Sequence, residues 1–443
     1  MKRLYSAATK FFFPKELIDE DHAIFYQGIK KSIIVQAFSY FFVFLSSLLL
    51  VKTAGVNNYG IYVNIFNWVS LLTIIACFGM EDVVLAEIPA YLRKKNPGGV
   101  KGLVYHANKV IFIVSLLSSI IFGLIIATGT VKGFSENKNV FLIALVNVYF
   151  ASFIIVNQQT LQAFNRFYAS QVADKLLKPF LLIILLAGFW VAGKNIDARL
   201  LILCNTAVLI ICAIVVFIFL QNTLAKLQPD KSKAPVKRKI LEQNGYFLLI
   251  SLFLLLKSKI SMLILGGIND TTSVGILNIA YRLSDFVLLP YALIHSVVPQ
   301  LFSGHQESDV FYKRKLFQKS TRVITVGSGI IILLIALLGK PILRFYDISL
   351  EEHYDILLIL CGSQFLYSLF GPSSAFLMMQ GKQKQAAIAL LLDVVLSCLF
   401  FFILINRFGL VGAAWAAFCA SLLYNIILRI MVSRHLSENT VPS

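Results

Sequence analysis

Residues 200–220 read LLILCNTAVLIICAIVVFIFL, a stretch of 21 residues without a charged side chain. An α-helix needs about 20 apolar residues to cross the hydrocarbon core of a bilayer, where it satisfies its own backbone hydrogen bonds. A transmembrane β-strand would alternate polar and apolar side chains, and this stretch does not. It therefore predicts a membrane-spanning helix.

The rest of the chain repeats this pattern. The sequence is 58% hydrophobic and 14% charged, with a mean hydropathy of +0.79, whereas an ordinary soluble domain is about 25% charged. Apolar runs predict twelve spans, at residues 33–52, 59–80, 110–130, 140–158, 173–192, 199–220, 246–267, 274–297, 322–339, 354–374, 386–405 and 411–431. We therefore expect an all-α polytopic membrane protein, and soluble function classes are excluded.

The basic residues predict the orientation of these spans, because short loops rich in lysine and arginine stay in the cytoplasm. With a cytoplasmic N-terminus, 29 of the 40 basic residues fall in cytoplasmic segments and 8 in external ones. A missed span would invert every later loop, so the bias favours twelve spans with both termini inside. The net charge of +18 is then mainly a topology signal. Because it is dispersed over many loops, nucleic-acid binding is not predicted.

The longest polar connector divides the spans six and six. The predicted organisation is a cytoplasmic N-terminal tail (1–32), a six-helix bundle (33–220), a cytoplasmic linker (221–245), a second six-helix bundle (246–431) and a cytoplasmic C-terminal tail (432–443). Each half has an even number of spans, so both enter the membrane in the same direction. We expect them to be related by a pseudo-two-fold axis along the membrane normal, with substrate passing between them.

Two pairs of segments support such a repeat. Residues 54–61, AGVNNYGI, resemble residues 266–276, GGINDTTSVGI, and both link the first two spans of a half. Residues 161–166, LQAFNR, resemble residues 377–382, LMMQGK, before the fifth span of each half. The similarities are short, but they recur in the same topological positions.

Several of these stretches together resemble a known family. They are residues 52–62 (KTAGVNNYGIY), 78–82 (FGMED), 381–383 (GKQ) and 406–414 (NRFGLVGAA). In order and placement they are similar to the polysaccharide transporter, or O-antigen flippase, branch of the multidrug/oligosaccharidyl-lipid/polysaccharide (MOP) exporter superfamily, whose fold is MATE-like. The resemblance covers nearly the whole chain.

This resemblance implies a flippase for undecaprenyl-diphosphate-linked oligosaccharides, from O-antigen lipopolysaccharide or another surface polysaccharide. Transport would occur by alternating access across the bacterial inner membrane, with a polysaccharide polymerase and glycosyltransferases as partners. No enzymatic activity and no cofactor are implied. Coupling to H⁺ or Na⁺ stays open, because this chain has Lys257 and Lys259 where many relatives carry an acid in the seventh span.

Charged side chains inside the spans are the candidate site residues, because each costs at least about 2.5 kcal/mol at mid-bilayer. Lys257 and Lys259 are rotated by about 200° from each other on the seventh span, whereas Arg282 and Asp285 share a face of the eighth. A Lys257–Asp285 ion pair is one hypothesis. A cationic wall of both lysines and Arg282, binding a diphosphate or acidic sugars, is another. Asp393, alone in the eleventh span, is a candidate for a coupling proton or a helix–helix hydrogen bond.

Further charged residues lie near the cytoplasmic ends of two spans. Those of the fifth span are Arg166, Asp174, Lys175 and Lys178. They are candidates for a cytoplasmic mouth where a lipid diphosphate arrives, and they also fit an ordinary topology signal. Glu81 and Asp82, which follow the second span, are expected to be solvated.

Other motifs mainly exclude chemistry. The six cysteines lie in apolar runs, and His295 is the one histidine inside a span. Neither set has metal-ligand spacing, so no metal is predicted. Pro290 is expected to bend the eighth span. The sequence has no Walker lysine loop and no nucleophile elbow, which excludes ATP hydrolysis by this chain.

Two alternatives to a flippase stay open. A multidrug exporter of the same superfamily would bind cationic drugs with acids and aromatic residues, and three bases inside the spans count against it. A membrane glycan polymerase or ligase usually carries a large external loop, whereas the longest external loop expected here is about residues 340–353.

Overall fold

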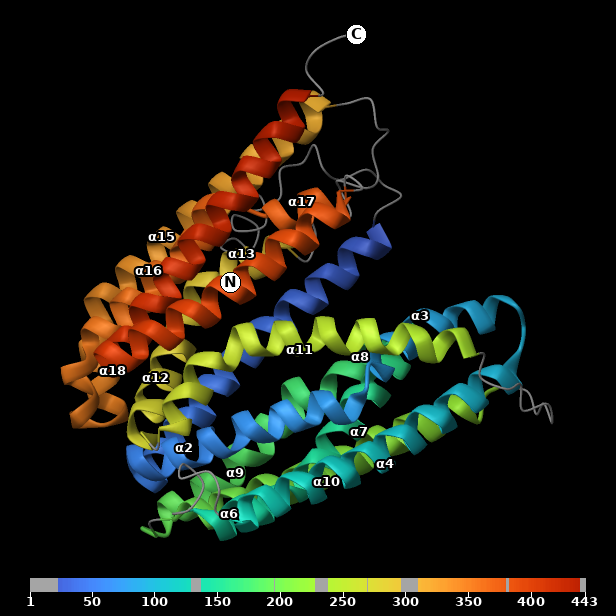
Figure 1. Cartoon of the computed structure of the whole chain (residues 1–443), viewed down its shortest axis with the longest axis horizontal. Helices are drawn as coiled ribbons and strands as arrows, with labels where there is room; N and C mark the ends of the chain where they lie inside the picture. The colour runs from blue at the N-terminus through green and yellow to red at the C-terminus, as the bar shows by residue number, and fades with distance from the viewer. Residues whose placement is uncertain are drawn as a thin grey trace.

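The computed structural model describes residues 23–128, 137–194, 196–227, 238–268, 270–295, 310–379 and 382–438. Every regular element within these ranges is a helix. Long uninterrupted helices follow from the composition, because an apolar segment in lipid must satisfy its backbone internally. Figure 1 shows two groups of helices that meet at the left and spread apart towards the right, with α2 and α11 between them.

The elements of the first half are α2 (Ala23–Cys77), α3 (Met80–Arg93), α4 (Pro97–Thr128), α6 (Lys138–Ala144), α7 (Val146–Ala163), α8 (Phe167–Gln171), the π-helix η3 (Val172–Leu177), α9 (Lys178–Val191) and α10 (Ala198–Leu224). Those of the second half are α11 (Arg238–Gly267), α12 (Thr271–Ser284), the 3₁₀-helix η4 (Asp285–Leu288), α13 (Leu289–His295), α15 (Val310–Tyr346), the 3₁₀-helix η5 (Ile348–His353), α16 (Tyr354–Phe370), α17 (Ser373–Met379) and α18 (Gln383–Glu438).

Two of these helices reverse direction at a glycine. Gly55 in α2 has a φ of 76°, and Gly409 in α18 has a φ of 56°. Glycine adopts these left-handed conformations without the steric cost that a side chain would carry. Each long helix is therefore two antiparallel crossings joined at a sharp corner, as Figure 1 shows.

Seven helices in the described residues are long and apolar enough to cross a membrane. Two of them, Phe38–Cys77 and Lys384–Arg434, contain the glycine reversals and cross twice. Helices α11, α9 and α16 supply the remaining crossings. The described part of the chain thus makes the twelve crossings predicted from the apolar runs.

The structure corrects the predicted spans in detail. The eighth span is not one bent helix, because η4 interrupts it between α12 and α13. Pro290 lies just after this interruption and has no backbone N–H to donate to the preceding turn. The ninth span continues to Tyr346, so Lys340 and Arg344 lie on a helix rather than in the expected external loop.

Equivalent glycines of the two halves pack against each other at the end where the helix groups meet, which we call the closed end. A Cβ atom on Gly60 would collide with the carbonyl oxygen of Thr271, and one on Gly275 would lie 2.8 Å from the Val56 carbonyl oxygen. Gly60 and Gly275 occupy corresponding positions in the predicted repeat. The backbones of α2 and α12 can therefore approach closely only because both positions lack a side chain.

Hydrogen bonds between the halves reinforce the closed end. Tyr59 donates from its hydroxyl to Asn278 Oδ1 at 2.7 Å. Ser47 Oγ and the Tyr346 hydroxyl lie 2.8 Å apart, at the far end of α15. Towards the opposite end the two helix groups diverge (Figure 1).

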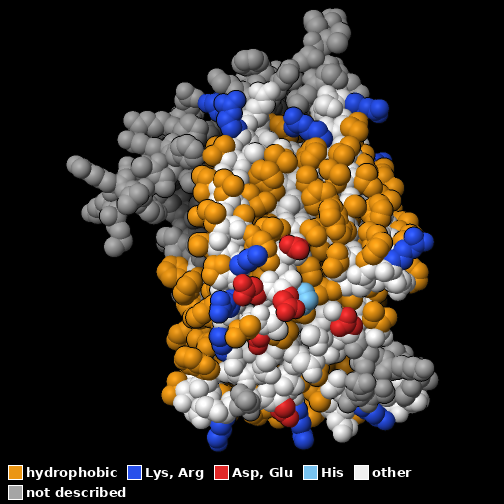
Figure 2. Space-filling view, turned by 90° about the vertical axis from the view of Figure 1, so that its left-hand side faces the viewer, with side chains coloured by type: hydrophobic (Ala, Val, Ile, Leu, Met, Phe, Trp, Pro, Cys, Tyr) orange, Lys and Arg blue, Asp and Glu red, His pale blue; other side chains and the backbone are white. Residues whose placement is uncertain are grey.

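The outer surface is apolar, as expected for helices that face lipid. In the most apolar stretch of each helix, only 17% of α4 and 22% of α15 is buried within the protein. Leu333 and Leu337 on α15 are 65% and 77% exposed. Figure 2, which views the closed end, shows a broad hydrophobic area above a smaller group of charged side chains. The polar groups therefore gather where the crossings end.

Candidate functional site

A cavity of about 360 Å³ lies between the two halves, and we call it the central cavity. Its walls come from α2, η3, α9 and α10 of the first half and from α11 and α12 of the second. Among the described residues, four cationic side chains and one acid line it, namely Lys175, Lys178, Lys259, Arg282 and Asp174. The cavity therefore carries a net positive charge and is suited to an anion.

The cavity brings together two groups of residues that lie far apart in the sequence and were predicted to serve separate sites. Lys259 and Arg282 were predicted for a cationic wall, and Lys175 and Lys178 for a separate cytoplasmic mouth. The structure places all four around one cavity. Arg166 is not among the lining residues. The signal from residue spacing alone could not reveal this, because the two groups lie on different halves.

Arg282 is fixed to the cavity wall by two hydrogen bonds. Its Nε donates to Asn278 Oδ1 at 3.0 Å, and its Nη1 donates to the Val43 carbonyl oxygen on α2 at 3.2 Å. The same Asn278 oxygen accepts the Tyr59 hydroxyl. Arg282 thus contacts both halves and has further N–H groups that can bind an anion in the cavity.

A π-helix positions the basic residues of the first half. The wider turn η3 runs from Val172 to Leu177 and leads directly into α9. Lys178 Nζ lies 3.9 Å from Asp174 Oδ1, and their side chains are 35% and 56% exposed. An ion pair this exposed contributes little stability, so an incoming anion can compete for Lys178 at low cost.

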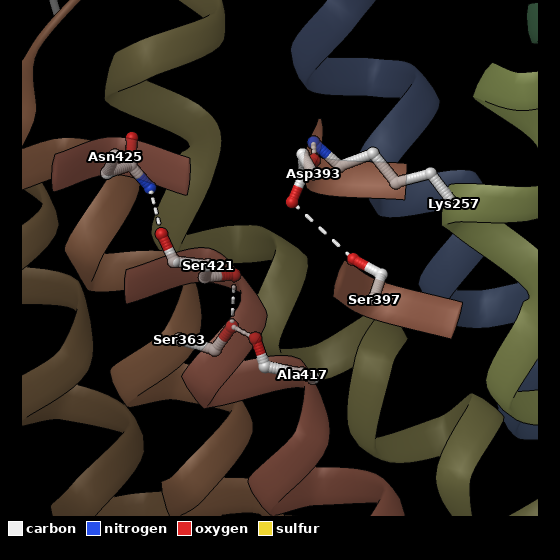
Figure 3. A network of polar contacts seen from close by, with 7 residues as sticks. All are labelled: Lys257, Ser363, Asp393, Ser397, Ala417, Ser421 and Asn425. Carbon is white, nitrogen blue, oxygen red and sulfur yellow. Dashed lines mark hydrogen bonds and ion pairs between the residues drawn. The ribbon is translucent and has the colours of Figure 1, made fainter. Parts of the chain in front are cut away.

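Lys257 points away from the central cavity into the second half. Its ammonium forms an ion pair with Asp393 on α18, whose side chain is 1% exposed (Figure 3). The ammonium also lies 4.1 Å from the centre of the Tyr424 ring and 5.5 Å from that of Tyr367. Because about 200° of helical rotation separates Lys257 from Lys259, the two lysines face different surroundings.

The predicted Lys257–Asp285 ion pair is therefore wrong in its partner. Asp285 begins η4, which packs on α16, and its carboxylate accepts a hydrogen bond from Gln364 Nε2 at 3.0 Å. Asp393 is not the lone acid expected from its position in the sequence. Ser397, one turn along α18, donates to its carboxylate at 3.5 Å.

Hydrogen bonds hold α18 to α16 beside this ion pair. Ser363 Oγ lies 2.8 Å from Ser421 Oγ, and it donates to the Ala417 carbonyl oxygen at 3.2 Å. Asn425 Nδ2 donates to the Ser421 carbonyl oxygen at 2.8 Å. Figure 3 shows this network next to Asp393. These bonds join α16 to the arm of α18 that follows Gly409, whereas Asp393 lies on the arm before it and has Lys257 of the neighbouring α11 as its partner.

Lys257→Met should destabilise the protein by about 3–5 kcal/mol, because it leaves the buried Asp393 carboxylate without its charge partner. The double variant Lys257→Met/Asp393→Leu should recover most of this loss, since no uncompensated charge remains. Unfolding of the purified protein in mild detergent measures both. Equal destabilisation of the single and double variants would show that the pair is not formed.

Glu81 corrects another expectation. Its side chain is 8% exposed rather than solvated, and one carboxylate oxygen accepts a hydrogen bond from Ser251 on α11 at 3.3 Å. Glu81 lies in the first turn of α3, beyond the second crossing. Burial raises the pKa of this carboxyl above its usual range, and the hydrogen bond from Ser251 opposes the shift. The residue links the two halves away from the closed end.

The uncharged side chains of the cavity were not predicted from the sequence. Tyr62, Asn67, Asn205 and Asn278 all line it, and the Tyr62 hydroxyl donates to Asn205 Oδ1 at 3.3 Å. The sequence feature that could have indicated these cavity residues is the presence of asparagines within apolar runs. Within the described ranges no three His, Cys, Asp or Glu side chains form a group that could hold a metal ion. The side chain of His295 lies outside the described residues.

Comparisons with known proteins place this geometry in context. A family model described as polysaccharide biosynthesis protein matches residues 25–305. No curated protein sequence matches the chain. Among solved structures, the chain is similar to an inward-facing multidrug resistance MATE family transporter of the MOP superfamily, with a TM-score of 0.71 and 14% identity over 90% of this chain and 95% of that one.

Two further structures share the fold. The lipid II flippase MurJ in an inward closed conformation matches with a TM-score of 0.65 and 17% identity, over 92% of this chain and 89% of MurJ. An outward-facing MATE family transporter matches with a TM-score of 0.64 and 13% identity, over 92% of this chain and 94% of that one. At these identities the similarity shows the fold, and it confirms the predicted arrangement of two six-helix bundles.

Proposed function

Since this chain belongs to the polysaccharide biosynthesis protein family, we propose that it is a member of the MOP exporter superfamily and a flippase for undecaprenyl-diphosphate-linked oligosaccharides. The oligosaccharide is a repeat unit of O-antigen or of another surface polysaccharide. The observation that carries this proposal is the central cavity, where four cationic side chains and one acid lie between the two halves.

The chemistry of the cavity supports an anionic head group. A diphosphate offers several oxygens that accept charge-assisted hydrogen bonds, the strong class of hydrogen bond in proteins. Arg282 provides a planar donor group, and Lys259 and Lys178 provide compact charges. The amides and hydroxyls of Asn67, Asn205 and Tyr62 suit the polar sugars that follow the diphosphate.

The closed end supports transport by alternating access. With both termini in the cytoplasm, as the basic loops predict, the closed end is periplasmic and the central cavity is reached from the cytoplasm. The lipid-linked sugar enters in this state. Separation of the halves at Gly60 and Gly275 would then release it on the other side of the inner membrane, where the polymerase acts.

The alternatives fit the cavity less well. A multidrug exporter for cationic compounds needs acids in its cavity, and in the part of the chain that the structure describes Asp174 is the one acid that lines it. Its carboxylate already lies near Lys178. A polymerase or ligase needs catalytic groups beside the lipid-linked sugar, and the lining residues comprise bases, amides, hydroxyls and apolar side chains around that single acid. We therefore propose a transporter rather than an enzyme.

Proteoliposomes test the proposal directly. The purified protein should expose a labelled undecaprenyl-diphosphate-linked oligosaccharide to an enzyme added outside, and undecaprenyl diphosphate without sugar should inhibit this by competing for the cations. Undecaprenol, which has the same tail and no charge, is the matched control and should not inhibit. Ethidium export by these vesicles without lipid flipping would favour the drug exporter instead.

A further inference from the structure

We propose that Asp393 is the proton-binding site of this transporter, and that a proton and the Lys257 ammonium compete for its carboxylate. The inference rests on the proposed function for its role in transport, but the site itself follows from the geometry of the ion pair. Figure 3 shows the two side chains meeting between α11 and α18, and neither is among the residues that line the central cavity.

Burial limits the Asp393 carboxylate to two states. Its side chain is 1% exposed, and an unpaired carboxylate at such a position is strongly disfavoured. It can be ionised while Lys257 neutralises it, or it can be neutral while it carries a proton. When a proton binds one carboxylate oxygen, Lys257 keeps its own three protons and is released from the pair. When that proton leaves to solvent, the ion pair re-forms.

The side chains packed around the pair explain why Asp393 is either paired with Lys257 or protonated. On α18 itself Ser397 and Tyr424 face the pair, Tyr367 of α16 interacts electrostatically with Asp393, and Tyr291 of α13 does so with Lys257. These neighbours are hydroxyls and phenols. Within the described part of the chain, Lys257 is the one charged group in contact with Asp393.

The same geometry disfavours an inorganic cation. A hard cation such as Na⁺ binds through several oxygen ligands, whereas the position beside Asp393 is filled by an ammonium that is tethered to the chain. Two aromatic rings cover that ammonium at 4.1 and 5.5 Å. We therefore infer coupling to protons and not to Na⁺.

Helix α11 links this proton site to substrate. Lys257 and Lys259 lie two residues apart on α11, and Lys259 lines the central cavity. Near the closed end Gly266 of α11 packs against Asn64 of α2. Release of Lys257 would remove the ion pair that joins α11 to α18 and let α11 shift its contacts with the first half. In the structure the Lys257–Asp393 ion pair is formed and the closed end is shut. Release of the proton from Asp393 therefore accompanies closure of this end.

Infrared difference spectroscopy on the purified, lipid-reconstituted protein tests the site without any substrate. Acidification protonates many carboxylates, so the diagnostic signal is the part of the wild-type carboxylic acid absorption that is missing from the spectrum of Asp393→Asn. Asp355→Asn, which removes an exposed carboxylate from the start of α16, is the matched control and should keep it. Identical carboxylic acid absorption in the wild type and in Asp393→Asn would overturn the assignment.

Flipping measurements test the coupling. A proton gradient across the proteoliposome membrane should accelerate flipping by the wild type at least 10-fold, and replacing Na⁺ by choline should change it less than 2-fold. Asp393→Asn should lose the acceleration. Loss of flipping in choline, with no effect of the proton gradient, would overturn the inference. If no lipid is flipped at all but the carboxylic acid absorption behaves as expected, the proposed function fails and the proton site stands.

Discussion

Gly60→Ala should reduce flipping at least 100-fold while the protein still inserts and folds. The new Cβ atom would collide with the carbonyl oxygen of Thr271, which is backbone and cannot rotate away. Overpacking of this kind costs about 1–3 kcal/mol or more, and the cost arises only in the state with the closed end shut. A cost of about 3 kcal/mol lowers the ratio of this state to the open one by more than 100-fold.

Graded variants separate this effect from a general defect. Gly275→Ala should be milder, because its Cβ would meet the Val56 carbonyl oxygen at 2.8 Å. Gly267→Ala lies at the same end of the molecule, where a Cβ would meet nothing within 4 Å, and should flip normally. An impermeant maleimide added outside should label Ser46→Cys in the cavity fastest when it is combined with Gly60→Ala. Labelling should be slower with Gly275→Ala and slowest with Gly267→Ala. Normal flipping by Gly60→Ala would contradict the assignment of the closed end.

Lys259→Gln combined with Arg282→Gln should weaken binding of undecaprenyl diphosphate at least 100-fold. Each substitution removes charge-assisted hydrogen bonds to the anion, worth about 1.5–3 kcal/mol, and tenfold in affinity corresponds to about 1.4 kcal/mol. The ligand-induced rise in unfolding temperature of the purified protein measures this affinity. The double variant should show almost no rise in unfolding temperature when undecaprenyl diphosphate is added.

Two control variants test whether the loss of affinity is specific to the charges of the central cavity. Lys194→Gln removes an exposed lysine outside the central cavity and should bind like the wild type. Arg282→Lys keeps the charge but loses the planar donor group that holds Asn278 and Val43, so it should retain part of the affinity. Wild-type affinity in the double variant would show that the diphosphate binds elsewhere.

Much of the fold could be predicted because lipid imposes strict rules on a chain. The length of each apolar run, the placement of basic residues and the glycine-containing turns before Gly60 and Gly275 are all local or periodic properties. They predicted twelve crossings and the repeat. The two glycines were recognised as equivalent, but their direct contact at the closed end was not expected, since a repeat in sequence does not specify which surfaces meet.

The candidate site was predicted less completely. The intramembrane bases were found because charge in an apolar run is conspicuous, and the 200° between Lys257 and Lys259 showed that they must diverge. Which lysine faces the cavity depends on how α11 is rotated against its neighbours. The interruption η4, which directs Asp285 towards Gln364, changed the expected pairing in the eighth crossing.

By itself, then, the sequence determined the class of protein, the number of crossings and the presence of buried charge. The reason is that the length of an apolar run and the free-energy cost of a charge in the bilayer are properties of each segment alone. Only the tertiary structure decided that Lys257 pairs with Asp393, and that Lys175, Lys178, Lys259 and Arg282 share one cavity. These contacts join residues on different helices, and their geometry depends on the packing of all the helices together.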